Sequence, residues 1–498
     1  MLQAGYFKNL KGELALVKAD SVAVSVWARM LHKAMDVAPF HQLLLAATMP
    51  RAGIESALRA IDADASSRMA ELVVERKRLQ NLVLELKGNI RVICRVRPFS
   101  AKEVVDGEQH GLAFPAAGEI TLLAGPSGGG NEGGSSKGGS AARSFEFDFV
   151  ADTECGQGRL YNEVQALGQS VLDGFNCCIF AYGQTGSGKT YTMTGTPADP
   201  GVNVRLMGEI FRLSQNAWTG CTYTFSVSMV ELYNDNIRDL LNTAVDPMQK
   251  DLSKQKAGNY LDIKLSADGS VVAARLQEQV CADEAAAVGV MEAGLKNRSV
   301  GATAMNAASS RSHLIVTLKV NCHNLVSGVH YESKLHMVDL AGSERLSRTE
   351  ATGDRLKEAQ AINKSLSALG DTMSSLARKD KHVPYRNSKL TYFLQDSLGG
   401  DSKTIMVVNA SPTATSLHET DCSLRFAQRV RKVELGNTKQ KAKPSKDAMG
   451  TAQKAQYEKA LQESEGRINA LQEELRAVRT KLRNADGGGK ARRPGPRR

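Results

Sequence analysis

The sequence predicts an α/β protein with a central, mostly parallel or mixed sheet flanked by helices. Segments rich in β-branched and apolar residues alternate with segments of helical spacing, an order typical of such a sandwich. Hydrophobic residues make up 42% of the chain and charged residues 23%, which allows a large core and excludes wholesale disorder. The strand-like segments are 144–150, 177–182, 222–232, 314–321, 334–340 and 404–410.

The length and composition set limits on the class of protein. A chain of 498 residues corresponds to two to four units, or to one large domain with flanks. The longest apolar stretch, 21–49, is broken by Arg29, Lys33 and Asp36, so we expect no membrane span. No secretion signal opens the sequence, and the eight cysteines form no C-x-x-C pair. We therefore expect a soluble intracellular protein with reduced thiols.

The N-terminal flank is predicted to be helical. Residues 1–65 read as a helical segment of unknown role, and residues 66–88 as a short coiled coil. Leucines 72, 79 and 86 recur every seven residues, but Arg76 interrupts the second seam position. An ordinary amphipathic helix therefore remains the alternative. The helical pattern ends at Gly88, before a β-branched run.

Two further segments punctuate the chain. The Gly/Ser tract 125–140 is too flexible to pack and is predicted to be an inserted surface loop. After a basic linker at 435–453, residues 454–485 carry a regular heptad of Leu461, Ile468, Leu475 and Leu482. Such a pattern predicts a coiled coil that makes a homodimer. Residues 486–498 form a basic tail.

The charge is concentrated at the C-terminal end. Residues 437–498 contain 16 Lys+Arg and 7 Asp+Glu, a net charge of +9, which leaves only +2 for the other 436 residues. A polycationic tail suits a polyanionic surface such as nucleic acid, anionic lipid or an acidic protein polymer. The alternative is a solvated end without a partner.

One motif specifies the chemistry. The run 183–190 matches G-x-x-x-x-G-K-[ST], follows an apolar strand and precedes a predicted helix, as a P-loop requires. Its backbone N–H groups can surround phosphate oxygens, Lys189 can neutralise the β- and γ-phosphates, and the Thr190 hydroxyl can bind Mg²⁺. A chance Gly-rich turn is the alternative. The predicted nucleotide-binding residues are Gly183, Gln184, Thr185, Gly186, Ser187, Gly188, Lys189 and Thr190.

Two polar clusters downstream are candidates for sensing the γ-phosphate. Residues 339–344 (DLAGSE) follow an apolar strand, the usual place for a Walker-B carboxylate, here Asp339. Residues 306–313 (NAASSRSH) bring hydroxyls, an amide and a guanidinium into one segment before a strand. An N-capping Asp339 and a Ser-rich turn are the structural alternatives.

These three motifs resemble the phosphate loop, switch I and switch II of the kinesin motor domain. The resemblance extends to 95–98 (RVRP), 230–234 (VELYN), 356–359 (LKEA), 362–369 (INKSLSAL) and 382–391 (HVPYRNSKLT). It covers about residues 89–434, which we take as the motor domain, and implies a kinesin-like P-loop NTPase that uses ATP and Mg²⁺.

The resemblance also implies individual roles. Arg95 and Pro98 would flank the adenine, with Tyr191 near it. Thr190 and Ser310 would complete the Mg²⁺ shell, with Asp339 acting through water. The catalytic set would act by positioning and charge neutralisation. In it, Gly342 senses the γ-phosphate, Glu344 pairs with Arg311 when the switches close and relays a proton, and two residues position the lytic water, namely Asn306 and Ser309.

The resemblance implies partners as well. Microtubules are the expected track, contacted by Lys364, Arg386 and Lys389, so the expected location is the cytoplasm and its microtubule cytoskeleton, spindle included. No nucleic acid partner is expected. The sequence around Gly88-Asn89 is similar to the neck of family-fourteen kinesins, which implies movement toward the minus end.

Several alternatives stay open at this stage. Residues 357–360 and 396–400 are similar to plant and algal calmodulin-binding kinesins, so calmodulin is a further expected partner, with the helix 467–483 as its candidate site. A microtubule crosslinker with little motility, whose basic tail is a second microtubule site, is the main functional alternative. A depolymerising kinesin ranks last.

Overall fold

The structure, a computed structural model, describes ten stretches of the chain. These are 90–123, 142–215, 221–242, 260–266, 271–302, 310–324, 328–344, 354–399, 402–433 and 442–443. The segments predicted at 1–65, 66–88, 454–485 and 486–498 lie outside them, as does the Gly/Ser tract 125–140. Within the described stretches, no helix has the length and hydropathy needed to cross a membrane.

A ten-stranded mixed sheet forms the centre of the molecule. Its main path runs β11-β7-β12-β13-β6-β14-β1-β5. The pairs from β13 to β5 are parallel, whereas β11, β7 and β12 pair antiparallel with their neighbours. The bounds are β1 Ile90–Val96, β5 Phe149–Ala151, β6 Asn176–Tyr182, β7 Cys221–Tyr233, β8 Asn236–Asp239, β11 Gln279–Cys281, β12 His313–Asn324, β13 His330–Asp339, β14 Ser402–Ala410 and β15 Ala442–Lys443.

The central strands are buried because helices cover both faces of the sheet. Every residue of β1, β6 and β14 is buried. Successive side chains of a strand point to opposite faces. Met406 and Val408 accordingly belong to one hydrophobic cluster, and Ile405 and Val407 to the other. Alternate residues of one buried strand therefore pack into two different cores, one on each side of the sheet.

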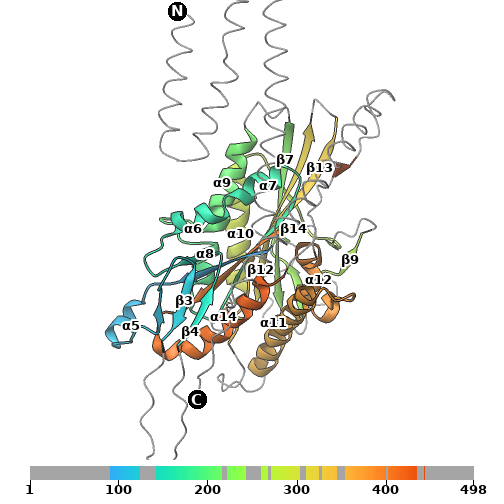
Figure 1. Cartoon of the computed structure of the whole chain (residues 1–498). Coiled ribbons are helices and arrows are strands. Elements are labelled where there is room, and N and C mark those ends of the chain that lie inside the picture. The colour runs from blue at the N-terminus through green and yellow to red at the C-terminus, as the bar shows by residue number, and fades with distance from the viewer. Residues whose placement is uncertain are drawn as a thin grey trace, which may run out of the picture.

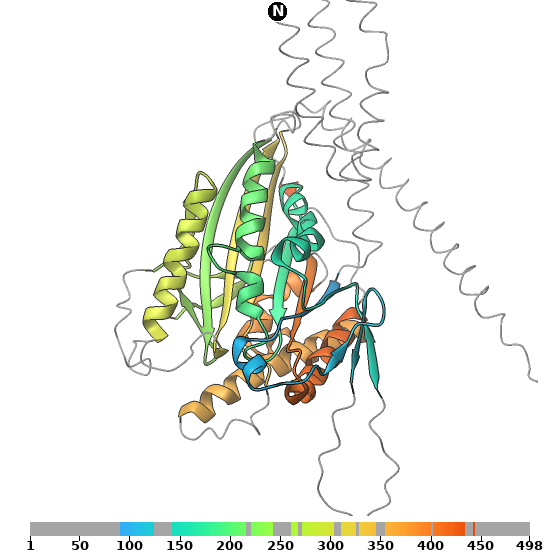
Figure 2. The same cartoon turned by 90° about the vertical axis from the view of Figure 1, so that its left-hand side faces the viewer.

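Each core is closed by its own set of helices, as Figure 1 shows. Figure 2 looks onto the face crossed by α9 and α10. This face carries α6 (Gln157–Val164), α7 (Ala166–Leu172), α9 (Val202–Ser214) and α10 (Glu284–Ala302). The other face carries α11 (Asp354–Arg378), η5 (Tyr385–Asn387), α12 (Lys389–Phe393), α13 (Gln395–Leu398) and α14 (Leu417–Arg431). The remaining helices are α5 (Ala101–Val105), α8 (Lys189–Met193) and η6 (Ala414–Ser416).

The prediction of one strand over 144–150 is wrong. Residues Arg143–Glu146 form β4 of a small sheet, whereas Phe149–Ala151 form β5 of the main sheet. Asp148 lies between them and accepts a hydrogen bond from the Val92 N–H at 2.7 Å. This bond fixes residue 148 beside β1, so the residues before it join the small sheet and those after it join the main sheet. The small sheets are β2 (Leu112–Ala113), β3 (Glu119–Leu122) and β4, and β9 (Ile263–Leu265) with β10 (Val271–Ala273).

Part of the predicted basic linker is a strand. Ala442 and Lys443 form β15, antiparallel to β13 at Tyr331 and His330. On this side β13 pairs with β6 only from Leu335 onward. The beginning of β13 therefore offers backbone groups that β6 does not reach, and β15 pairs with them.

The topology brings three loops to one edge of the sheet. Strands β6 and β13 are parallel neighbours, so their carboxyl ends meet, with Asp339 opposite Ala181. Strand β12 runs the other way, and its first residues lie at the same edge, where Leu314 pairs with Asp339. The chain after β6, after β13 and before β12 is therefore brought together. These are the three loops singled out in the sequence.

Candidate functional site

The loop after β6 is shaped by glycines with positive φ. Gly183, Gly186 and Gly188 have φ values of 151°, 78° and 96°, in the region that favours glycine. A Cβ on Gly183 would lie 2.3 Å from the carbonyl oxygen of Asn409. The loop can therefore pass under the end of β14 only with glycine at this position. It leads directly into α8, whose N-terminus points at the loop.

Lys189 is held inside this loop. Its side chain is buried, with a relative exposure of 6% for the residue. Its ammonium donates at 2.8 Å to the carbonyl oxygens of Gly183 and Gln184. Burial lowers the pKa of Lys189, and the nearby carboxylates of Asp339 and Glu344 oppose that shift. Among the described residues, this buried cation donates its hydrogen bonds to loop carbonyls, so it is well placed to bind phosphate oxygens.

Thr190 and Asp339 form a suitable site for a magnesium ion. The Thr190 hydroxyl donates to Asp339 Oδ2 at 2.7 Å. Asp339 is 2% exposed, and within the described part of the chain its Oδ1 has no hydrogen-bond partner. Burial raises the pKa of this carboxyl group, with the Thr190 hydrogen bond opposing. A hydroxyl beside a buried carboxylate with an unused oxygen fits Mg²⁺, which prefers oxygen ligands.

The segment after β13 lies on the phosphate loop. Glu344 accepts hydrogen bonds from the Thr185 backbone N–H at 2.8 Å and from the Thr185 hydroxyl at 2.5 Å. The Ser343 N–H donates to the Gly183 carbonyl at 3.1 Å. The Gly342 N–H, expected to sense a phosphate, donates to the Ser310 carbonyl at 2.9 Å. The structure thus joins the two switch segments and the P-loop through backbone groups.

Arg311 and Glu344 are not paired in this arrangement of the described residues. Arg311 Nη1 lies 3.1 Å from Glu358 Oε2 on α11 instead. The expected Arg311–Glu344 pair belongs to closed switches, so both side chains would have to change partners to form it. Two other predicted catalytic residues, Asn306 and Ser309, lie outside the described residues.

The predicted adenine side contains a buried arginine. Arg95 donates at 2.8 Å to Gln157 Oε1 and at 2.9 Å to the Thr192 hydroxyl. Burial lowers its pKa. Its guanidinium lies 5.2 Å from the ring centroid of Tyr191, which is 41% exposed. Pro98 is exposed as well. Tyr191 and Pro98 are therefore accessible to a base, whereas Arg95 is fixed behind them.

Sequence reasoning missed two residues that shape the site. Arg97 Nε donates to the Gly186 carbonyl at 2.7 Å, and its other nitrogens bind Glu103, whose pKa they lower to about 2. Gln157 binds both Arg95 and the Tyr191 carbonyl. Alternation along β1 puts positions 95 and 97 on the same side and could have indicated Arg97. No local signal marked Gln157.

The three predicted microtubule contacts lie on or beside α11, η5 and α12, on the face of the sheet that these helices cover. Lys364, on α11, is exposed and pairs with Asp235 at 3.2 Å. The other oxygen of Asp235 accepts from the Lys389 backbone N–H at 3.1 Å. Arg386 is exposed, with its guanidinium 5.6 Å from the Tyr392 ring. One acidic residue therefore connects α11 with the start of α12.

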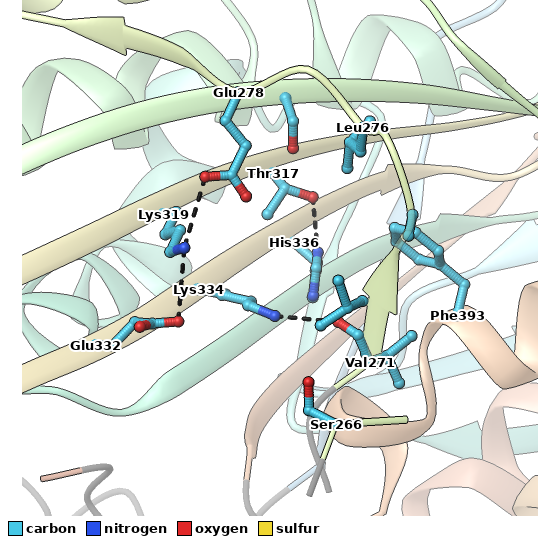
Figure 3. A pocket seen from close by; sticks show the side chains of 13 residues that line it. Ser266, Val271, Leu276, Glu278, Thr317, Lys319, Glu332, Lys334, His336 and Phe393 are labelled. Atoms are coloured by element: carbon cyan, nitrogen blue, oxygen red, sulfur yellow. Dashed lines mark hydrogen bonds and ion pairs between the residues drawn. The ribbon is translucent and has the colours of Figure 1, made fainter. Parts of the chain in front are cut away.

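A separate cavity of about 500 Å³ contains none of these residues (Figure 3). One wall is a polar face of β12 and β13, where Lys319 lies 3.5 Å from Glu278 and 3.7 Å from Glu332. Lys334 donates to the Val271 carbonyl at 3.2 Å. Burial lowers the pKa of His336 in this cavity to about 4. The two lysines and two glutamates of the cavity balance in charge, and we assign the cavity no part in nucleotide binding.

The fold and the site together define a P-loop nucleotide-binding protein with two switch segments. Residues 95–433 match the family model of the kinesin motor domain. The chain therefore belongs to the kinesin family.

Plant kinesin-like proteins are among its curated relatives. It is 46% identical over 378 residues to the kinesin-like protein KIN-14J of Oryza sativa subsp. japonica, covering 76% of this chain and 43% of that protein. It is 43% identical over 408 residues to KIN-14S of Arabidopsis thaliana, covering 82% and 50% respectively. The chain thus spans half or less of the length of these two relatives.

Solved structures agree with the fold. A structure described as that of a fast kinesin superposes with a TM-score of 0.61 at 35% identity, covering 72% of this chain and 96% of that one. A second, from a study of mutants and the activation of the kinesin motor ATPase, gives a TM-score of 0.55 at 34% identity. It covers 69% of this chain and 98% of that one. Both likenesses concern the motor domain.

Proposed function

We propose that this protein is a microtubule-stimulated ATPase that moves along microtubules toward their minus ends. The observation that carries the proposal is the convergence of Lys189, Thr190, Asp339 and Glu344 on one phosphate loop, in a chain of the kinesin family. The minus-end direction rests on Gly88-Asn89 and on the KIN-14 names of the relatives.

Nucleotide binding uses groups that already point into the loop. Lys189 exchanges its bonds with the Gly183 and Gln184 carbonyls for bonds with phosphate oxygens, and the base lies against Tyr191 and Pro98. Thr190 and Ser310 would hold Mg²⁺, with Asp339 acting through a water molecule. This ion would neutralise charge on the phosphates.

Hydrolysis depends on the switch segments. In our proposal, Glu344 leaves Thr185 and pairs with Arg311, and the Gly342 N–H turns from Ser310 to the γ-phosphate. Asn306 and Ser309 orient the water, whose proton passes toward Glu344. The residues act by position and charge, without a covalent intermediate.

A second candidate is a microtubule crosslinker with little motility. The net charge of +9 over residues 437–498 favours it, because such a tail can bind the acidic surface of tubulin on its own. The heptad at 454–485 supports a homodimer in either case. Calmodulin remains a further proposed partner of the same C-terminal region.

A gliding assay on polarity-marked microtubules tests the proposal. The full chain is attached to glass, and we expect ATP-dependent gliding with plus ends leading. Glu344→Ala is the matched control: it should bind ATP but lose steady-state turnover and gliding, because switch closure and the proton path both need that carboxylate. Immobile but bound microtubules with the unaltered chain would favour the crosslinker, and plus-end-directed movement would refute the direction.

A further inference from the structure

Arg311 has a second carboxylate available to it on α11. Glu358 is 3% exposed and lies in the first part of this helix. One of its oxygens lies 3.1 Å from Arg311 Nη1. The other accepts a hydrogen bond from the Tyr233 hydroxyl, at the end of β7. Together with Glu344, the site therefore contains one switch guanidinium and two carboxylates that can bind it.

The same helix contacts the switch I segment at a second point. Ser365 is seven residues after Glu358, two helical turns further along the same face. Its hydroxyl lies 2.8 Å from His313 Nε2. Residues 311 and 313 thus both contact the buried face of α11, and the same helix exposes Lys364. The Glu358 contact is consequently part of how α11 is joined to the nucleotide site.

We propose that Glu358 is a positioning residue that holds Arg311 away from Glu344 and thereby restrains hydrolysis in the absence of microtubules. The inference rests on the proposed ATPase function and adds a competing partner to it. Closing the switches requires Arg311 to exchange Glu358 for Glu344.

The exchange is unfavourable because Glu358 is buried. Once Arg311 leaves, the carboxylate keeps only the Tyr233 hydroxyl as a partner among the described residues. A buried charge that loses its counter-charge is strongly destabilised. Microtubule binding to α11 can relieve this restraint by moving the N-terminal part of the helix, which carries Glu358. Removing the charge of Glu358 should therefore raise turnover without microtubules, whereas removing the Tyr233 hydroxyl should lower it.

Two variants separate this role from a merely structural one. Glu358→Gln preserves the shape and removes the charge, which should favour the exchange about tenfold, since a charge-assisted bond becomes a neutral one. ATP turnover without microtubules should rise by about that factor, and the ratio of stimulated to basal turnover should fall. Tyr233→Phe removes the remaining partner of the carboxylate, so basal turnover should fall several-fold.

The matched control is Ser374→Ala. Ser374 lies on the same helix, and its hydroxyl donates to the Gly370 carbonyl within α11. This variant should leave basal turnover and its stimulation unchanged. All variants are compared by turnover in the full-length protein with and without microtubules, and by thermal unfolding.

The outcomes are separable. Equal falls in basal turnover for Glu358→Gln and Tyr233→Phe, with lowered melting temperatures, would overturn the proposal and leave a structural role. Unchanged basal turnover in Glu358→Gln would overturn it too. If the unaltered protein itself showed no microtubule stimulation, the proposed function would fail instead, and any rise in Glu358→Gln would still report the exchange.

Discussion

The buried His313 bridges Ala341 of switch II and Ser365 of α11, and replacing it tests this bridge. Its Nδ1 accepts a hydrogen bond from the Ala341 N–H at 3.0 Å, so the ring proton lies on Nε2 and is donated to the Ser365 hydroxyl. Ser365 in turn donates to the Ile362 carbonyl. Burial lowers the pKa of His313 to about 3, with Arg298 and Lys189 acting in the same direction. A neutral His313 therefore bridges the two segments.

The pH dependence follows from the difference between folded and unfolded pKa values. In the unfolded chain the pKa of a histidine is about 6.5. The folded pKa is lower, so the contribution of His313 to stability is complete above pH 6.5 and is lost as the pH falls toward 3. At pH 5.0 the loss amounts to about 2 kcal/mol, from about 1.5 pH units at about 1.4 kcal/mol each.

The assay is urea unfolding of the wild type and of His313→Asn at pH 7.5 and 5.0. The asparagine oxygen can replace Nδ1 as the acceptor for Ala341 but does not titrate. The variant should be less stable at pH 7.5, and its deficit in the free energy of unfolding should shrink by about 2 kcal/mol at pH 5.0. Ser365→Ala, which keeps the imidazole, should retain the wild-type pH dependence. A deficit equal at both pH values would refute the reasoning.

The two remaining predictions concern the track. Alanine at Lys364 or Arg386 should raise the microtubule concentration for half-maximal turnover several-fold. Alanine at the half-buried Lys389 should raise it less. Added salt should make these differences smaller. Salt-insensitive binding would count against this surface, and turnover without microtubules is the control. Truncation after Gly436 should shorten microtubule residence and make it less salt-sensitive, with little change in turnover at saturating microtubules. A several-fold rise in turnover would instead reveal an autoinhibitory tail.

Much of the site could be read from local sequence. The glycines of 183–188, the lysine after them and the carboxylate at 339 each follow an apolar strand, and parallel strands bring their carboxyl ends to one edge. Thr190 and Asp339 accordingly lie within hydrogen-bonding distance of each other. The apolar residues within β6 and β14 also allowed these strands to be predicted, because a strand buried on both faces needs a continuous run of hydrophobic residues.

Tertiary structure alone decided which partner each charged group takes. The resemblance implied an Arg311–Glu344 pair for closed switches, and in the arrangement described here the guanidinium lies against Glu358, 47 residues along the chain. Sequence specifies which charges exist, but their pairing depends on distances of a few ångströms between elements packed from far apart. The same reason explains why β15 was read as a linker: a two-residue strand exists only because β13 offers it unpaired backbone groups.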